Sequence, residues 1–323
     1  MLDSLPTDLT SGGVTLSSDE STFGYLTETR FEPGADQAAA LRRQMDRDGY
    51  LYLKGLIPRD LVLAAREEIL LKFAIVGEID AVNHPVLDGV LSGESWADQV
   101  NLLAFAESLR RGRAYSDVVE SKEIYTFWET FLGGKVRSFD FRWPRFMRLG
   151  EATGIHCDGP YISRGTSSVW STWVPLGDIE LQNGPIMVLE GSHRNPELTA
   201  YLQQDADRDK IGWLSSDALA LRERLGGRWL SANFEAGDAL VFGRGLVHAS
   251  IDNASSERRC RLSSDTRYQL ASEPLDERYN GKGASNPHGG PRRAFYPGRA
   301  PGNNEEFQEE WKLVDERGRL VQH

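Results

Sequence analysis

Apolar positions recur at helical spacing along the first third of the chain. The pattern predicts helices over residues 36–47, 59–74, 95–111 and 117–132. Gly49 follows the first of them as a C-terminal cap, Pro58 stands where the first turn of the second tolerates it, and Gly133 follows the last. A single strand, over residues 50–53, is expected among them. The N-terminal part of the chain is therefore predicted to be mostly helical.

The pattern changes beyond Lys135, where short β-prone runs alternate with Gly, Pro and Asn turns. These runs cover residues 136–148, 168–175, 185–189, 229–234, 238–243 and 259–269. A polar insertion at about 194–227 interrupts them and is expected to be helical around 216–225. Spaced strands of this kind suggest a sandwich or a barrel. Helices followed by strands, without alternation, favour an α+β fold with a mainly β core over a doubly wound sheet.

Composition and charge narrow the class of protein. Of the 323 residues, 40% are hydrophobic and 26% are charged, which is typical of a globular chain with a sizeable core. The 37 basic and 48 acidic residues give a net charge of −11, and no long basic block interrupts this balance. Neither nucleic acid nor an anionic membrane surface is therefore an expected partner.

Cysteine usage and the first residues bear on location. Cys157 and Cys260 are too few for the disulfide framework of a small secreted scaffold. Residues 1–13 lack the basic and apolar regions of a signal peptide, and nowhere do 18 consecutive apolar residues occur. We expect a cytoplasmic protein, and its oligomeric state is left open.

One histidine-containing segment carries the candidate chemistry. In the run Gly154–Gly159, His156 and Asp158 are two residues apart, so in extended backbone both side chains point to the same face. The Gly237-Asp238 turn leads into an apolar strand, and a second histidine, His248, follows at the far end of this strand. Two histidines and one carboxylate on separate strands form the facial triad of non-haem Fe(II) oxygenases, which leaves coordination positions open. A structural zinc site would close its fourth position, usually with sulfur.

Arginines gather on the strand that follows the distal histidine. Arg259, Arg261 and Arg267 alternate with apolar or small residues and are expected to share one face. Guanidinium groups inside a sandwich are costly unless an anion pairs with them. A dicarboxylate cosubstrate would supply such an anion.

With these features the sequence resembles the phytanoyl-CoA dioxygenase family of Fe(II)/2-oxoglutarate oxygenases. The resemblance covers most of residues 35–270. It is carried by Asp48-Gly49-Tyr50-Leu51, Lys54-Gly55-Leu56-Ile57-Pro58, His156-Cys157-Asp158, Trp173-Val174-Pro175-Leu176-Gly177-Asp178, Asn183-Gly184-Pro185, Gly191-Ser192-His193, Gly237-Asp238, His248-Ala249-Ser250 and Arg261-Leu262-Ser263.

The resemblance implies a double-stranded β-helix, or jelly roll, with an N-terminal helical layer packed on one sheet. A single oxygenase domain would then span residues 1–323. Its parts would be a helical region at about 35–132, a jelly-roll core at about 136–270 and an irregular C-terminal extension at about 272–323.

The resemblance also implies roles for individual residues. His156, Asp158 and His248 would bind iron, while Trp173 and Ser250 match positions that line the cosubstrate pocket. An arginine of the last strand would hold the distal carboxylate of 2-oxoglutarate. Arg261 is preferred because of its Arg-x-Ser pattern, whereas Arg259, eleven residues after the distal histidine, is the nearer rival.

Three further residues are weighed individually. Arg267, at the far end of the strand, is expected to face the substrate or to pair with Asp265. Tyr161 lies near the expected mouth of the site, where core packing and substrate contact are equally open. His193 is expected to stand in a polar turn, without a ligand role.

The predicted function is that of an Fe(II)/2-oxoglutarate dioxygenase that uses O2 and hydroxylates an unactivated C–H bond. The products from the cosubstrate would be succinate and CO2. Because an acidic chain suits coenzyme A poorly, the expected substrate is a small metabolite or a natural-product intermediate. A metal-dependent hydrolase and a non-catalytic jelly-roll binding module are the alternatives, and Asp158 disfavours a halogenase, which lacks the carboxylate ligand.

Overall fold

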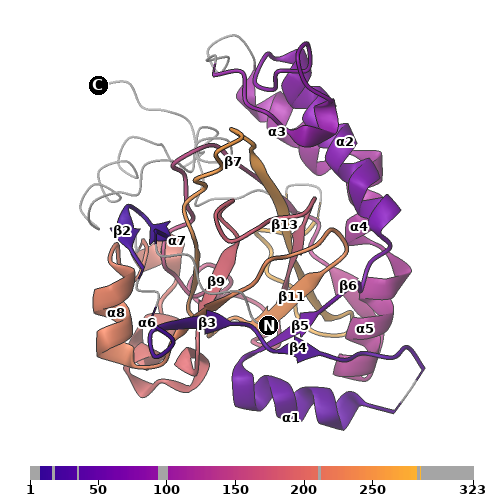
Figure 1. Ribbon diagram of the computed structural model, residues 1–323. Helices are drawn as coiled ribbons and strands as arrows, with labels where there is room; N and C mark the ends of the chain where they lie inside the picture. Colours follow the sequence, from indigo (N-terminus) through magenta and orange to yellow (C-terminus); the bar gives the residue numbers. More distant parts are fainter. Residues whose placement is uncertain are drawn as a thin grey trace.

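The computed structural model describes residues 8–16, 19–34, 36–93, 101–209, 212–281 and 284. Two β-sheets face each other at its centre, and helices cover the outer face of the larger one (Figure 1). This is the α+β jelly roll that the sequence predicted, with the helical layer on one sheet.

Within the described residues the larger sheet has seven strands, in the order β4-β5-β11-β8-β13-β6, with β7 also paired to β13. Its members are β4 (Glu28–Thr29), β5 (Tyr50–Leu53), β6 (Val136–Ser138), β7 (Trp143–Met147), β8 (Trp170–Pro175), β11 (Ala239–Gly243) and β13 (Arg261–Leu270). The long strand β13 pairs with β6, β7 and β8, so it is the strand that organises this sheet.

The smaller sheet runs in the order β12-β9-β10-β3. Its strands are β3 (Phe23–Tyr25), β9 (Ile186–Leu189), β10 (Trp229–Ser231) and β12 (His248–Ser250). A separate hairpin joins β1 (Thr10–Ser11) to β2 (Val14–Thr15). Trp173 and Phe242 of the larger sheet pack with Val188 and Leu230 of the smaller one in a core between the sheets.

The helical layer consists of α1 (Ala38–Asp48), α2 (Arg59–Ile75), α3 (Leu102–Arg110), α4 (Arg113–Val119) and α5 (Lys122–Leu132). Apolar side chains of these helices, among them Leu41 and Phe127, form one core with Val241 and Leu262 of the larger sheet. The helices and the larger sheet thus share one core. Gly49 ends α1 at a φ of 82° and donates to the Met45 carbonyl at 2.8 Å, which confirms the predicted cap.

The prediction of one helix over residues 117–132 is wrong in one respect. The chain forms two helices there, because α4 ends at Val119 and Ser121 caps a new helix. The side chain of Ser121 accepts a hydrogen bond from the backbone N–H of Ile124 and so caps the start of α5. The helix predicted over 95–111 is found as α3, and residues 95–100 lie outside the described part of the chain.

The polar insertion folds into short helical segments beside the smaller sheet (Figure 1). They are α6 (Thr199–Leu202), α7 (Ala206–Asp209) and α8 (Ala218–Leu225), together with the single turns η3 (Ser192–Arg194) and η4 (Pro196–Leu198). Another single turn, η1 (Val86–Asp88), follows α2. Among the helices that the structure describes, none is both long enough and apolar enough to cross a membrane.

Candidate metal centre and carboxylate cavity

Two histidines from distant segments pair directly across the backbone. His156 and His248 form an antiparallel bridge, in which each N–H donates to the other residue's carbonyl at 3.0 and 2.9 Å. Their rings lie 4.2 Å apart, and Asp158 follows two residues after the first histidine. One donor atom from each of the three side chains lies within 4.8 Å of the other two, and all three residues are buried. The structure therefore brings together the predicted triad.

Each imidazole is held so that one nitrogen remains available. Nδ1 of His156 lies 2.8 Å from the Gly154 carbonyl, and Nδ1 of His248 lies 3.0 Å from the Leu246 carbonyl. A carbonyl can only accept, so both rings carry their proton on Nδ1 and leave Nε2 free as a metal ligand. The Nε2 atoms of His156 and His248 lie 3.8 and 3.9 Å from the same oxygen of Asp158.

The larger sheet holds the carboxylate of Asp158 at both oxygens. Arg267 of β13 donates to Oδ1 at 2.7 Å, and the hydroxyl of Ser171 on β8 donates to Oδ2. Arg267 and Ser171 are directly opposite each other in the pairing of β13 with β8. Because Oδ1 is also the oxygen that faces both histidines, the sheet presents this atom to the position where a metal would lie.

Burial and local charge set the protonation states of the triad. Burial alone would raise the pKa of Asp158, but the charge of Arg267 outweighs it and holds that pKa below its ordinary range, with smaller contributions from the two histidines at the low pH where they are protonated. Burial, with a smaller contribution from His248, lowers the pKa of His156 to about 3. Burial likewise lowers the pKa of His248. The site at neutral pH is therefore one carboxylate and two neutral imidazoles, the states that bind a divalent metal ion.

A narrow cavity of about 20 Å3 opens beside the two histidines. Trp173, Ile186 and Phe242 form its apolar wall. Its other polar lining consists of Arg145, Thr153, Ser250, Arg261, Asp265 and Arg267. Trp173, Ser250 and Arg261, which were expected near the cosubstrate, thus lie around one space. Arg267, which was expected to face the substrate or to pair with Asp265, lines the same space.

Arg261 differs from Arg145 and Arg267, the other arginines of this cavity, because it has no acidic partner among the described residues. Its side chain is 2% exposed, its Nε donates to the Gly184 carbonyl at 3.0 Å, and its Nη1 donates to the Ser263 hydroxyl at 2.6 Å. In the described part of the chain no carboxylate lies within 4.0 Å of it, and burial lowers its pKa to about 9. A buried guanidinium without a counter-ion is costly, so this position is suited to receive an anion.

The expectation that Arg259 shares this face is wrong. The strand β13 begins only at Arg261, because the preceding Cys260 N–H bonds instead to the Gly89 carbonyl at 2.8 Å. Arg259 therefore lies before the strand, with its side chain 44% exposed and paired with Glu257 at 2.6 Å. Arg259 does not line the cavity, so its position does not support it as the residue that binds 2-oxoglutarate.

The remaining predicted residues have definite places. Arg267 pairs with Asp265 at 2.9 Å as well as with Asp158, and the Trp143 ring covers its guanidinium at 4.5 Å. Of its two expected roles, pairing with Asp265 is the one observed. Tyr161 stands edge-on to the His156 ring at 5.6 Å and is absent from the cavity lining. His193 lies away from the triad, with Nε2 3.1 Å from the Asp46 carbonyl.

Sequence reasoning missed Ser171 and Arg145. Ser171 lies in the predicted strand 168–175, but only the register with β13 brings it to Asp158. Arg145 lies on β7, opposite Ser263, and its Nε donates to Asp265 at 2.7 Å. Alternation along a predicted strand could have placed each on an inward face, but no local signal names their partners.

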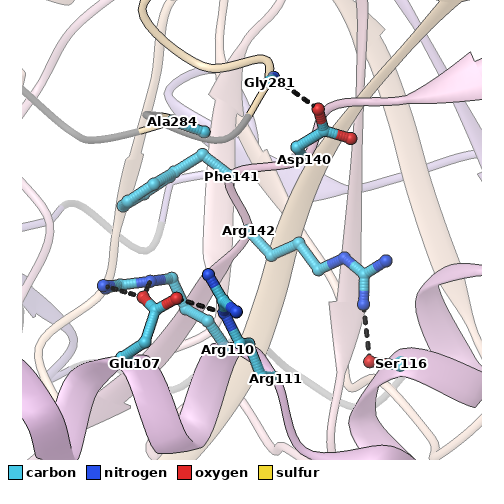
Figure 2. A pocket seen from close by; sticks show the side chains of 9 residues that line it. All are labelled: Glu107, Arg110, Arg111, Ser116, Asp140, Phe141, Arg142, Gly281 and Ala284. Atoms are coloured by element: carbon cyan, nitrogen blue, oxygen red, sulfur yellow. Dashed lines mark hydrogen bonds and ion pairs between the residues drawn. The ribbon is translucent and has the colours of Figure 1, made fainter.

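A second cavity, of about 330 Å3, is larger but lacks comparable chemistry (Figure 2). It lies beside α3, where Arg110 and Arg111 both pair with Glu107. Arg142 is also engaged, since its Nη1 donates to the Ser116 hydroxyl at 2.6 Å. None of the predicted site residues lines this space. The narrow cavity is therefore the better candidate for a reaction site.

Comparison with known proteins agrees with this geometry. Residues 45–260 match the family model described as phytanoyl-CoA dioxygenase. The 1-deoxypentalenic acid 11-beta-hydroxylase of Streptomyces exfoliatus is 30% identical over 251 residues, covering 74% of this chain and 84% of the relative. The protein of the same name from Streptomyces arenae is 29% identical over 251 residues, with the same coverage. The crystal structure of EctD from S. alaskensis with bound Fe has a TM-score of 0.51 at 19% identity, covering 79% of this chain and 84% of that chain.

Proposed function

The chain belongs to the phytanoyl-CoA dioxygenase family, and from this premise we propose that His156, Asp158 and His248 hold Fe(II) while Arg261 holds 2-oxoglutarate. The protein is a 2-oxoglutarate-dependent hydroxylase of this family. The observation that carries the residue assignment is that one cavity is lined by both histidines of the triad and by Arg261, a buried arginine without an acidic partner among the described residues.

In such a reaction the residues of this chain would bind the metal ion, bind the cosubstrate and exclude water from the site. The two Nε2 atoms and Oδ1 of Asp158 would offer three ligands to a divalent metal ion, and a site with only three protein ligands leaves coordination positions for the cosubstrate and O2. Iron supplies the oxidising chemistry when O2 reacts and 2-oxoglutarate is converted to succinate and CO2. Arg261 binds the distal carboxylate of the cosubstrate, and Ser263 and the Gly184 carbonyl fix the direction of its guanidinium.

The apolar wall of the cavity has its own function. Trp173 and Phe242 are 4% and 2% exposed, so they exclude water from the space between the triad and Arg261. In a dry site the attraction between a guanidinium and a carboxylate is stronger than in water. Ser250 contributes by position, since its hydroxyl accepts the Thr153 N–H at 2.7 Å and thereby closes the cavity beside His248.

We propose that the substrate is a small metabolite or a natural-product intermediate that is hydroxylated at an unactivated C–H bond. Two curated relatives are named as hydroxylases of 1-deoxypentalenic acid, which supports a small organic molecule. A cytoplasmic location remains the prediction from the sequence. A hydrolase that used the same triad would have no need of a dicarboxylate anchor, and a binding module would need neither the triad nor Arg261.

The function is tested by coupled turnover. Protein loaded anaerobically with Fe(II) is mixed with 2-oxoglutarate, O2 and a panel of small metabolites, and succinate is measured by mass spectrometry. We expect succinate only when iron, 2-oxoglutarate and O2 are all present, with a rise for at least one panel member and none for Asp158→Ala. Oxidation of a panel member at the full rate without 2-oxoglutarate would overturn the proposal.

A further inference from the structure

A second arginine, Arg145, reaches the same cavity from another strand. It lies on β7 directly opposite Ser263 of β13, the residue whose hydroxyl accepts from Arg261. Its Nε donates to Asp265 at 2.7 Å, and its side chain is 28% exposed. Neither of its two Nη groups donates a hydrogen bond to any residue that the structure describes. Arg145 thus carries unused donors into a space that already contains a candidate anion site.

The three arginines around the cavity differ in how many of their N–H groups already donate to residues that the structure describes. Arg267 is occupied on both Nη groups by Asp158 and Asp265 and is covered by the Trp143 ring. Arg145 uses only its Nε, so its paired Nη groups retain the fork that matches a carboxylate. Asp265 does not repel an incoming anion strongly, because Arg267 and Arg145 each bind one of its oxygens.

The charge of Arg145 acts on Arg261. Burial is the main cause of the lowered pKa of Arg261, and the charge of Arg145 lowers it further. The cavity is lined by three positively charged side chains, those of Arg145, Arg261 and Arg267. The negative charges are two, from Asp265 in the lining and from Asp158 in the triad. A divalent metal ion and one molecule of dianionic 2-oxoglutarate would cancel each other and leave this excess of one positive charge.

We propose that Arg145 binds a carboxylate in this cavity other than the one held by Arg261. Two sources share this chemistry, namely the 1-carboxylate of 2-oxoglutarate and a carboxylate of the substrate. The inference rests on the proposed function, since it takes the distal carboxylate of 2-oxoglutarate to lie at Arg261.

The test compares Arg145→Gln with a matched control. Arg228→Gln removes another arginine whose Nε donates to a carboxylate, that of Glu190 at 3.0 Å, at a place that does not line the cavity. Calorimetry on anaerobic Mn(II)-loaded protein measures the binding of 2-oxoglutarate and of 2-oxopentanoate, which lacks the distal carboxylate. A second series measures the binding of 1-deoxypentalenic acid and its methyl ester to the Mn(II)- and 2-oxoglutarate-loaded protein.

A contact to the 1-carboxylate predicts that Arg145→Gln weakens both 2-oxo acids about tenfold or more. A contact to a substrate carboxylate predicts the same loss for 1-deoxypentalenic acid but not for its ester. Arg145→Lys should lose less, because it keeps the charge without the two-pronged geometry. Arg228→Gln should equal the wild type in every series.

Three results would overturn the inference. Loss of affinity for 2-oxoglutarate alone would place Arg145 at the distal carboxylate. Affinities of Arg145→Gln that stay within about twofold of the wild type in both series would show that the arginine only neutralises Asp265. Recovery of the lost affinity in Arg145→Gln/Asp265→Asn would show that it acts only through that charge. Failure of the proposed function looks different, because the wild type itself would then not bind 2-oxoglutarate.

Discussion

Arg261 and Arg267 point from the same face of β13, yet of the two only Arg267 has carboxylate partners in the part of the chain that the structure describes. Arg267 is held by Asp158 and Asp265, whereas Arg261 donates to a carbonyl and a hydroxyl, both neutral. One strand therefore carries a cation that completes the metal site and a cation that is available to a ligand. This difference assigns separate roles to two chemically identical side chains.

The first prediction concerns the affinity for 2-oxoglutarate. Arg261→Ala should weaken binding to the metal-loaded protein by roughly 30- to several-thousand-fold, because a charge-assisted pair in a desolvated pocket is lost. Arg261→Lys should rescue only part of this loss. Calorimetric titration of the three proteins measures the effect directly.

Arg259→Ala is the control for this experiment, since that side chain is 44% exposed and pairs with Glu257. It should bind 2-oxoglutarate as the wild type does. A large defect confined to Arg259→Ala would move the anchor to that residue and contradict the assignment.

The second prediction concerns metal affinity. Asp158→Ala should abolish stoichiometric binding of Fe(II), whereas Ser171→Ala should leave a site with about 10- to 100-fold weaker affinity, because the hydroxyl that orients Oδ2 is gone. Equilibrium titration with Fe(II) under anaerobic conditions separates the two variants. Ser264→Ala is the matched control, because this buried serine of β13 bonds to the Tyr115 hydroxyl at 2.7 Å and does not touch Asp158. Unchanged metal binding in Asp158→Ala would refute the triad.

The proximity of His156 and Asp158 could be predicted from the sequence because its cause is local, namely the alternation of side chains in extended backbone. His248 joins them through a long-range backbone bridge with His156, and the sequence indicated this residue only by its type and by the family resemblance. The order of helices and strands likewise indicated the fold before any contact was known.

The choice between Arg259 and Arg261 depends on a contact that the sequence does not show. The start of β13 is decided by the bond from Cys260 N–H to Gly89, a residue of the helical part of the chain. The role of Arg145 depends in the same way on Asp265, which lies on a different strand. The break between α4 and α5 at Ser121 differs from these two cases because its cause is local. The serine cap starts the second helix although the apolar pattern continues through it.

The third prediction is a pH dependence of stability in the metal-free protein. The pKa of His156 is about 3 in the folded protein, whereas its ordinary value is 6.5. Between these values the unfolded chain binds a proton that the folded protein does not, so the free energy of unfolding decreases as the pH falls through this window. The upper limit for this histidine is about 1.4 kcal/mol for each pH unit.

Denaturant unfolding of chelator-treated protein at pH 6.5 and pH 5 measures this effect. The wild type should lose up to about 2 kcal/mol more than His156→Gln over this interval. His84→Gln, which changes an exposed histidine, should keep the wild-type loss. Equal losses in the wild type and His156→Gln would show that this histidine is not responsible.

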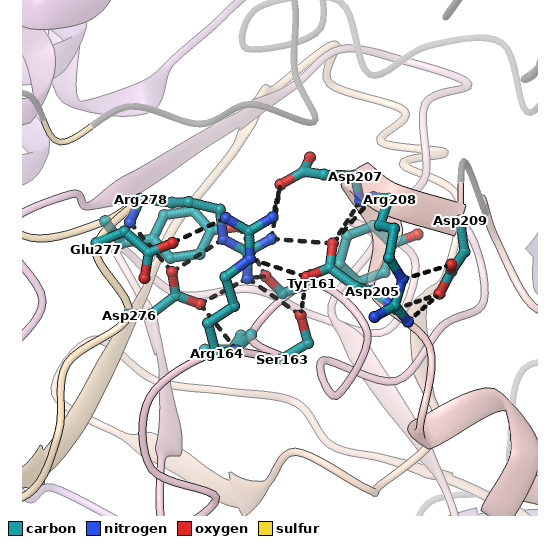
Figure 3. Close-up of polar contacts among 12 residues, drawn as sticks. Tyr161, Ser163, Arg164, Asp205, Asp207, Arg208, Asp209, Asp276, Glu277 and Arg278 are labelled. Carbon is teal, nitrogen blue, oxygen red and sulfur yellow. Dashed lines mark hydrogen bonds and ion pairs between the residues drawn. The ribbon is translucent and has the colours of Figure 1, made fainter.

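The last prediction concerns the ion-pair network around the buried residue Arg278 (Figure 3). Arg278 is at its centre, because its guanidinium binds Asp276 at 2.6 Å, Asp207 at 2.7 Å and the Tyr161 carbonyl at 3.0 Å. The side chains of Arg278 and Asp276 are only 7% and 0% exposed. The network thereby ties the loop after Asp158 to α7 and to the segment that follows β13.

Arg278→Met should lower the free energy of unfolding by about 3 to 5 kcal/mol, because it leaves the carboxylate of Asp276 buried without its main counter-charge. Chemical denaturation of the metal-free protein measures this loss. Arg224→Met is the matched control, since it breaks an ion pair with Glu197 whose side chains are 63% and 48% exposed. That variant should lose at most about 1 kcal/mol, because an exposed pair is screened by water. Equal losses in the two variants would mean that the network contributes no more than an exposed ion pair.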